Sequence, residues 1–399
     1  MVRTLLGLSV SSGLEGVDAA AVQVVGLGLD LNARVVAAPR VAFPPGVRDV
    51  FRAGGASPAA LPPGFLRGIA DTAAFAARQA LGKAGASPRD TFAVGLLEPA
   101  RPAPPIPVHW PEVAERVAEQ TGVTVLHGFA DRDRAAGGTG RPLTAAADFL
   151  LFRDTSETRL LVHLGSVTTA VLVPAGAKLS DAFAFEAGPG NALLDSVLFH
   201  GTRGKEHCDA GGKQAVQGQC LEPLLARWAE HPHLTRSPPK AVHADAFGRS
   251  FLLAAFDAGR QLGAALPDLL CTATHLVARA VGGACGLPPM KPEGARRVLL
   301  TGGGVRNGFL WQLVARRLGG AAERGDAAGV PALARNAACA AALAALTCDG
   351  VSGNLPVLTG ATGGRLLGHI APGDSRNWAR CAAWLADQTG EYPRANRAA

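Results

Sequence analysis

A strand–turn–strand pattern that occurs twice constrains the fold of this chain more than any other feature. Residues 3–10 are apolar and predict a buried strand, and a second apolar stretch follows at 17–25 after a short turn. The same pattern returns at 159–174, where small residues form the turn. Because each copy opens one half of the chain, the sequence predicts two related α/β lobes.

Apolar residues recur at helical spacing between and after these strands. A chain of 399 residues is too long for one ordinary core, so we divide it into lobes at 1–149 and 150–399. Residues 98–109 are rich in proline and are not expected to form a regular element. Helices are expected at 63–84, 110–121, 190–200, 212–229, 245–283, 306–318 and 331–347.

Composition and charge exclude several classes of protein. Hydrophobic residues make up 48% and charged residues 18%, which is typical of a globular chain and excludes disorder as the main state. The net charge is +7, which can favour anionic partners. However, the sequence has no run of five Lys or Arg and contains only 1 Tyr for base stacking, so no nucleic-acid partner is expected. The 7 cysteines are irregularly spaced without C-x-x-C, so neither disulfides nor zinc is indicated.

No stretch of the sequence predicts a membrane segment. The apolar run at 337–346 is much shorter than the roughly 18 residues that a span needs, and the N-terminal apolar stretch is too short for a signal sequence. We therefore expect no membrane partner and a cytoplasmic location.

A second turn pattern points to a nucleotide. The strand at 297–300 runs into Gly302-Gly303-Gly304, and Asn307 begins the helix that follows. Glycines at such a junction let the backbone approach a ligand closely. The sequence lacks G-x-G-x-x-G after its first strand and also lacks the P-loop, G-x-S-x-G and H-E-x-x-H motifs. His163 and His127 are interpreted as bonded core or turn histidines, with a base as the alternative for His163.

Six segments, in order along the chain, resemble motifs of the anhydro-N-acetylmuramic acid kinase family. The first, GLSVSSGLEGVD at 7–18, is similar to the family's G-x-M-S-G-T-S-L-D-G-V-D. The others are FADRDRAAGGTGRPL at 129–143, FEAGPGNALLD at 185–195, SPPK at 237–240, TGGGVRN at 301–307 and GNLPVLTGA at 353–361.

The resemblance implies a fold of the actin-like ATPase and sugar kinase class, with two ribonuclease-H-like lobes around a central cleft. It also implies a reaction in which ATP and water open the 1,6-anhydro ring of anhydro-N-acetylmuramic acid while O6 is phosphorylated. The product is N-acetylmuramic acid 6-phosphate, an intermediate of cell-wall recycling. The expected cofactors are ATP and Mg²⁺, the expected partner is a small amino sugar, and a homodimer is expected from the family alone.

The resemblance also assigns roles to residues. Glu186 stands where the family has the aspartate that takes a proton from the attacking water. The sugar is expected to contact Arg132, Asp133, Gly137, Gly138 and Asn191. The nucleotide is expected at Ser11, Ser12, Gly13, Leu14, Glu15, Gly16, Val17, Asp18, Gly165, Ser166, Gly302, Gly303, Gly304 and Asn307.

Several of these assignments also have a purely structural interpretation. Glu186 is then a surface carboxylate, Arg132-Asp133 an ion pair, and Asn191 the cap of the following helix. The segments Gly302–Gly304 and Ser11–Gly13 are then only tight turns.

Several contact positions depart from the family pattern. Leu97-Glu98-Pro99-Ala100 stands where the family has H-G-Q-T, and an arginine expected soon after Lys240 is missing. Glu186 is one methylene longer than the family's aspartate. Two alternatives therefore stay open beside the kinase: a catalytically silent nucleotide- or sugar-binding protein of the same fold, and a kinase for a different anhydro- or amino sugar.

Overall fold

In the computed structural model the chain divides into two compact units. Residues 1–153, 177–181 and 329–399 form unit 1, and residues 154–176 and 182–328 form unit 2. Residues 329–399, which we expected in the second lobe, pack with the first unit. The structure describes residues 1–11, 13, 15–52, 61–62, 64–99, 108–243, 245–290 and 296–391.

Unit 1 is built on a sheet with the strand order β12-β6-β5-β1-β2-β3, and β4 pairs with β2 beside β3. The first three strands form an antiparallel meander, whereas β5 and β6 run parallel to β1. The strands are β1 (Val2–Val10), β2 (Gly16–Val25), β3 (Asn32–Ala37), β4 (Arg40–Ala42), β5 (Thr91–Leu97), β6 (Val125–His127) and β12 (His369–Ala371).

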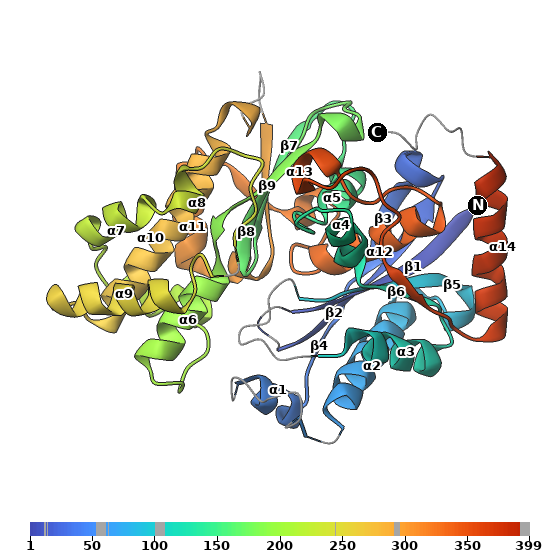
Figure 1. Cartoon of the computed structure of the whole chain (residues 1–399), viewed down its shortest axis with the longest axis horizontal. Coiled ribbons are helices and arrows are strands. Elements are labelled where there is room, and N and C mark those ends of the chain that lie inside the picture. Colours follow the sequence, from blue (N-terminus) through green and yellow to red (C-terminus); the bar gives the residue numbers. More distant parts are fainter. Residues whose placement is uncertain are drawn as a thin grey trace. The chain divides into compact units, whose positions relative to one another are not determined.

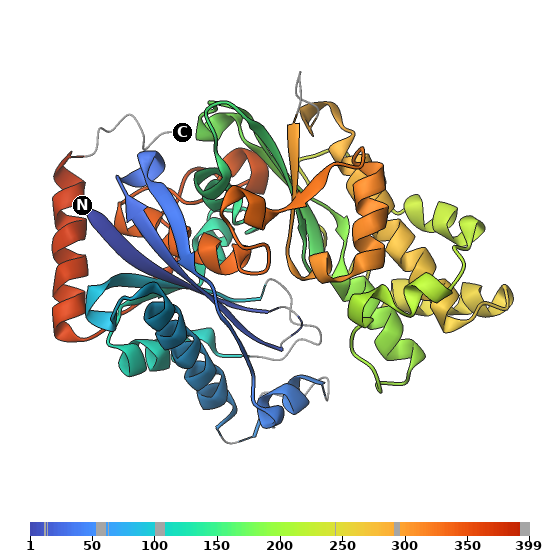
Figure 2. The same cartoon turned by 180° about the vertical axis from the view of Figure 1, so that it is seen from behind.

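Helices cover both faces of this sheet (Figures 1 and 2). Alternate residues of β1 face opposite sides, so Leu6 and Leu8 join the core beneath α2 (Phe65–Ala84) and α3 (Trp110–Thr121). Gly7 faces the other side, where α12 (Arg335–Cys348) packs directly on the strand backbone. The remaining helices of the unit are α1 (Pro45–Arg52), α4 (Phe129–Ala135), α5 (Ala145–Phe152), α13 (Pro356–Thr359) and α14 (Ser375–Glu391).

Unit 2 contains a five-stranded sheet of order β11-β10-β7-β8-β9. Its strands are β7 (Thr158–Leu164), β8 (Val167–Val173), β9 (Phe183–Pro189), β10 (Arg296–Thr301) and β11 (Ala322–Arg324). Helix α10 packs on β8 and β9 and is flanked by α6 and α11 (Figure 1). The helices are α6 (Asn191–Gly201), α7 (Glu222–Ala229), α8 (Pro232–Thr235), α9 (Arg249–Gln261), α10 (Leu266–Cys285) and α11 (Gly308–Arg317).

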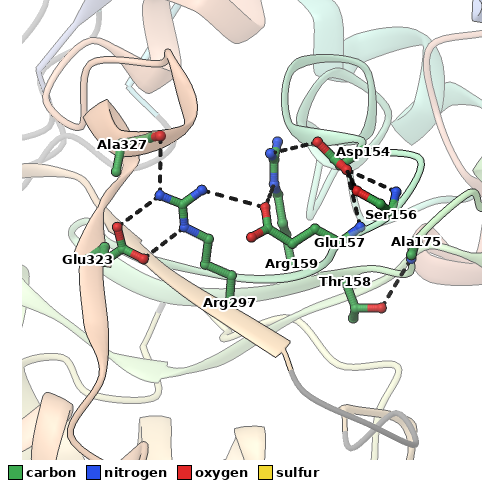
Figure 3. A network of polar contacts seen from close by, with 9 residues as sticks. All are labelled: Asp154, Ser156, Glu157, Thr158, Arg159, Ala175, Arg297, Glu323 and Ala327. Atoms are coloured by element: carbon green, nitrogen blue, oxygen red, sulfur yellow. Dashed lines mark hydrogen bonds and ion pairs between the residues drawn. The ribbon is translucent and has the colours of Figure 1, made fainter.

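Ion pairs join the amino-terminal ends of β7 and β10 to β11 (Figure 3). Arg297 donates to both carboxylate oxygens of Glu323 at 2.8 Å. Glu157 accepts from Arg159 at 2.8 Å and lies 3.5 Å from an Arg297 nitrogen, so one carboxylate bridges two neighbouring strands. The network crosses the sheet at the end opposite to the glycine turn that follows β10.

The two sheets share one topology. Leaving aside β4 and β12 of unit 1, each sheet has three antiparallel strands followed by two parallel ones, and the order in space is third, second, first, fourth, fifth. This arrangement is the ribonuclease-H-like sheet, and it confirms both the repeated design and the expected α/β fold of two ribonuclease-H-like lobes.

Several expected helices are confirmed, and two are wrong in extent. The segment 110–121 is α3, and 63–84 is α2 with its first turn at Phe65. The segment 245–283 is two helices, because Gly263 has a positive φ of 66° and Pro267 lies in the first turn of α10, where a proline is tolerated. The segment 212–229 is helical only from Glu222 onward apart from short 3-10 turns. Among the helices of the described ranges, none is both long and apolar enough to cross a membrane.

Candidate functional site

The turns expected to bind nucleotide in unit 2 lie together at one edge of its sheet. Because β7 and β10 are parallel, Gly165-Ser166 and Gly302–Gly304 both follow carboxyl ends of strands at the same edge. The backbone N–H of Asn191 donates to Gly165 O at 2.8 Å, and its side-chain Nδ2 donates to Leu164 O at 3.1 Å. Asn191, expected to contact the sugar, therefore belongs to this group of turns.

The three consecutive glycines differ in what requires them. Gly302 has a φ of 87°, and a Cβ there would lie 2.7 Å from Leu164 O. A Cβ at Gly304 would lie 2.6 Å from the Leu164 Cβ. Gly303 is exposed, and a Cβ there would only meet Asn191 Nδ2 at 3.6 Å, an ordinary contact. Packing thus explains why residues 302 and 304 are glycine, whereas it does not require a glycine at 303.

Two asparagines at helix starts have different functions. Asn307 is the N-cap of α11, where its Oδ1 accepts from the Leu310 backbone N–H at 3.0 Å, so the predicted helix start is confirmed. The N-cap of α6 is Gly190 rather than Asn191, and the capping interpretation of Asn191 is wrong. Its amide instead ties α6 to the end of β7.

His163 is a bonded strand-end histidine, as expected. It pairs in register with Thr301 across β7 and β10, and its Nδ1 lies 3.1 Å from Thr301 Oγ1. The imidazole thereby joins the two strand ends from which the glycine turns begin.

Glu186 lies on β9, and its side chain is buried with 5% of the residue exposed. Its Oε2 accepts a hydrogen bond from the backbone N–H of Val242 at 2.5 Å. The pairing of β8 with β9 shifts register just beside it, between Thr168 and Thr169. The surface-carboxylate interpretation is therefore wrong, and the carboxylate is held inside the unit.

In unit 1, the turn at 11–18 is closed by the hydroxyl of its first residue. Ser11 Oγ accepts from the backbone N–H groups of Glu15 and Gly16 at 3.0 and 3.3 Å. Val17 and Asp18 already belong to β2, where they pair with Val10 and Ser9. Gly13 is exposed, and Ser12 and Leu14 lie outside the described residues.

Arg40 is a cation at this turn that sequence reasoning missed. It comes from β4, which pairs with β2 in a register that places Arg40 opposite Asp18. Its guanidinium lies 3.3 Å from Glu15 Oε2 and 3.8 Å from Asp18 Oδ1. The strand pairing that brings it there joins residues far apart in sequence, and no local pattern indicates it.

Arg132 and Asp133 point in different directions from α4. Asp133 is fully buried, and its carboxylate accepts from Asn354 Nδ2, Thr359 Oγ1 and the Gly140 N–H, each at 2.7 Å. Arg132 is exposed, and its side chain makes no hydrogen bond or ion pair with another described residue. The two residues therefore do not form an ion pair, and that interpretation is wrong.

Gly137 and Gly138 follow α4 and form part of the loop that Asp133 holds. Gly138 must lack a side chain, because a Cβ there would lie 2.2 Å from Asp133 Oδ2. Gly137 has a φ of 83° and open space around it. The loop between α4 and α5 is therefore shaped by one buried carboxylate.

Glu98 and His127 meet where β5 and β6 end. Glu98 Oε1 accepts from the Gly128 N–H at 2.7 Å and lies 4.0 Å from His127 Nδ1. Burial raises the pKa of Glu98 and lowers the pKa of His127. Glu98 belongs to the segment that stands where the family has H-G-Q-T, and His127, at the end of the neighbouring strand β6, lies beside it.

The described residues contain no group of three or more His, Cys, Asp or Glu side chains placed to hold a metal ion.

Comparison with known proteins identifies relatives along almost the whole chain. The family described as anhydro-N-acetylmuramic acid kinase matches residues 112–373. The anhydro-N-acetylmuramic acid kinase of Streptomyces coelicolor is 32% identical over 413 residues, covering 98% of this chain and 98% of that protein. The corresponding protein of Gloeobacter violaceus is 31% identical over 379 residues, covering 92% and 98%.

Solved structures resemble the chain more distantly. Component A of the (R)-2-hydroxyglutaryl-CoA dehydratase of Acidaminococcus fermentans has a TM-score of 0.42 and 13% identity, covering 85% of this chain and 96% of that one.

Proposed function

The chain belongs to the anhydro-N-acetylmuramic acid kinase family, and we propose that it is an ATP-dependent kinase of 1,6-anhydro-N-acetylmuramic acid. In the proposed reaction the oxygen of water bonds to C1 as the C1–O6 bond breaks. O6 then takes the γ-phosphoryl group of ATP, and one proton of the water is lost to a base. The products are N-acetylmuramic acid 6-phosphate and ADP, which places the proposed reaction in peptidoglycan turnover.

The observation that carries this proposal is the buried, oriented carboxylate of Glu186. A general base must lie within hydrogen-bond reach of the proton it takes and must hold that geometry. Glu186 is fixed by Val242, and it stands at the position of the family's catalytic aspartate. We assign to it the proton of the attacking water.

The nucleotide is proposed to bind at the glycine turns of unit 2. Gly303 has no packing requirement to be glycine, and the absence of a side chain there lets a ligand approach the backbone. Gly165, Ser166 and Asn191 lie in the same group of turns. We further propose Mg²⁺ as a cofactor, which when bound with ATP would neutralise charge on the phosphates during transfer.

The turn at 11–18 is proposed to contact the phosphates with help from Arg40. Phosphoryl transfer is accelerated chiefly by positioning and by electrostatic stabilisation of the transferred group. Arg40 supplies a positive charge beside Glu15 and Asp18, and a phosphate would compete with these carboxylates for it.

The sugar is proposed to contact Arg132. N-acetylmuramic acid carries a carboxylate on its lactyl ether, and guanidinium groups bind carboxylates through paired hydrogen bonds. Arg132 is exposed, and no described residue pairs with it. Asp133 is proposed to act indirectly, by shaping the loop that contains Gly137 and Gly138.

A panel of acceptors tests this function. The protein is incubated with ATP and Mg²⁺ and with anhydro-N-acetylmuramic acid, N-acetylmuramic acid, N-acetylglucosamine or glucose, and the products are identified by mass. We expect a phosphorylated product from the anhydro sugar, heavier by one phosphoryl group (HPO3) and one water. Phosphorylation of another sugar alone would favour a kinase with a different acceptor. ATP binding without any product would favour the silent binding protein.

A further inference from the structure

The main chain of Glu186 is bonded on the side of β9 that faces away from β8. β9 is the edge strand of its sheet, and no further strand of the described ranges pairs with it there. The Glu186 N–H donates to Lys240 O at 3.0 Å, and His233 Nε2 lies 3.0 Å from Glu186 O. Lys240 Nζ in turn donates to His233 O at 2.9 Å. The three residues therefore form a closed circuit of hydrogen bonds.

We infer that His233 and Lys240 are positioning residues that fix the Glu186 carboxylate through this circuit. The inference rests on the proposed function, in which Glu186 is the base. Neither side chain is placed in contact with substrate, and both act through the backbone of β9 and of residues 240–242.

The chemistry of His233 suits a permanent hydrogen-bond donor to the Glu186 carbonyl. A carbonyl oxygen only accepts, so the imidazole must carry its proton on Nε2 to bond Glu186 O. Burial lowers the pKa of His233 to about 4, and the ring therefore stays neutral at physiological pH. A neutral ring with one N–H keeps the same bond across the pH range in which a kinase works.

Lys240 is unusual as a buried ammonium. Only 5% of the residue is exposed, and Nζ lies 5.8 Å from the centre of the Phe185 ring. Burial lowers its pKa to about 8. An apolar side chain at this position would avoid the cost of burying a charge. Lys240 instead makes a hydrogen bond that links the carbonyl of His233 to the segment at 240–242.

The circuit reaches the carboxylate through Val242. This residue follows Lys240 by two positions, and its N–H is the donor to Glu186 Oε2. Loss of the His233 or Lys240 bond would free the segment that carries this donor. Because catalysis is sensitive to displacements of about 1 Å, the base would then lose its alignment.

Steady-state kinetics with paired variants test the inference. We expect His233→Ala and Lys240→Met to lower kcat by about 10-fold to 100-fold, with KM for ATP and for the sugar changed less than about threefold. His233→Gln, which can donate from its amide to Glu186 O, should recover most of the rate. Thr274→Val is the control, because the Thr274 hydroxyl is buried in α10 and, among the described residues, bonds Leu270 O alone, so the variant should keep the wild-type kcat.

Amide hydrogen exchange supplies a readout that does not depend on turnover. The Glu186 and Val242 amides should exchange about 10-fold faster in His233→Ala than in the wild type, and Thr274→Val should leave them unchanged. An unchanged kcat, or unchanged exchange at both amides, would overturn the inference. If the wild type makes no sugar phosphate, the proposed function fails, while the exchange rates still decide whether the circuit holds Glu186.

Discussion

Glu186 Oε2 lies 2.5 Å from the backbone nitrogen of Val242, and this bond depends on the length of the glutamate side chain. An aspartate at this position is one methylene shorter and could not reach the same donor from the same backbone. The glutamate that departs from the family pattern is therefore matched to its own surroundings.

The first prediction concerns this match. Glu186→Asp, although it restores the family's residue type, should lower kcat by about 10-fold to 100-fold because the carboxylate loses its donor and moves by about 1 Å. Single-turnover rates on the anhydro sugar measure the effect. A rate equal to or above that of the wild type would show that the Val242 bond does not set the position of the base.

The second prediction concerns the contact between α12 and the sheet of unit 1. A Cβ at Gly7 would lie 1.6 Å from Ala337 O, and one at Gly95, its partner in register, 2.1 Å from Ala340 O. Gly95→Ala should therefore lower the free energy of unfolding by more than about 2 kcal/mol, since the helix must move away. Gly82→Ala in α2 meets nothing within 4 Å and should stabilise by about 0.5–1 kcal/mol. Urea unfolding measures both, and similar effects of the two changes would contradict this account of the packing.

The third prediction separates a buried ion pair from an exposed one. Arg335 Nε donates to Asp148 Oδ1 at 2.7 Å, and both side chains are almost completely buried. Arg335→Met should cost about 3–5 kcal/mol of unfolding free energy, because it leaves a buried carboxylate without its partner. Glu323→Gln, which breaks the exposed pair with Arg297, should cost far less, because solvent screens that pair. The comparison is made by denaturant unfolding at pH 7, and equal losses would argue against the role of burial.

The fourth prediction concerns pH. Burial lowers the pKa of His233 from its ordinary value of 6.5 to about 4. As the pH falls below 6.5, the unfolded chain binds a proton at this histidine that the folded protein does not bind. The contribution of His233 to the free energy of unfolding is therefore fully present above pH 6.5 and is lost as the pH falls toward 4. The loss from this residue is about 2–3 kcal/mol by pH 4.5.

His233→Gln isolates that contribution from the other titrating groups. Unfolding free energies are measured for wild type and variant at pH 7 and pH 4.5. The wild type should lose about 2 kcal/mol more than the variant over this interval. Parallel losses would mean that the histidine is not buried in its neutral form.

The sequence predicts the local parts of this structure well. Helical periodicity locates α3 at 110–121, and the small-residue turns locate both strand pairs that open the units. These features depend on residues close together in the chain. The sequence also predicts that a helix begins at Asn307, which the structure shows as the N-cap of α11.

The parts that the sequence does not predict depend on contacts between distant residues. The return of 329–399 to unit 1 rests on a three-residue strand, His369–Ala371, paired with β6, and on the packing of α12 over Gly7. Arg40 reaches the turn at 11–18 by strand pairing, and Glu98 meets His127 where two parallel strands end. For the same reason Val242 could not be recognised as the partner of Glu186.

The most direct test of the central claim is single-turnover phosphorylation of anhydro-N-acetylmuramic acid with ATP and Mg²⁺, on the wild type and on Glu186→Gln. The amide keeps the size of the side chain but cannot take a proton. The account predicts N-acetylmuramic acid 6-phosphate from the wild type and none above background from the variant, with ATP bound equally by both. Equal rates of sugar phosphorylation in the two proteins would contradict the assignment of Glu186 as the base, and no product from either would contradict the proposed kinase.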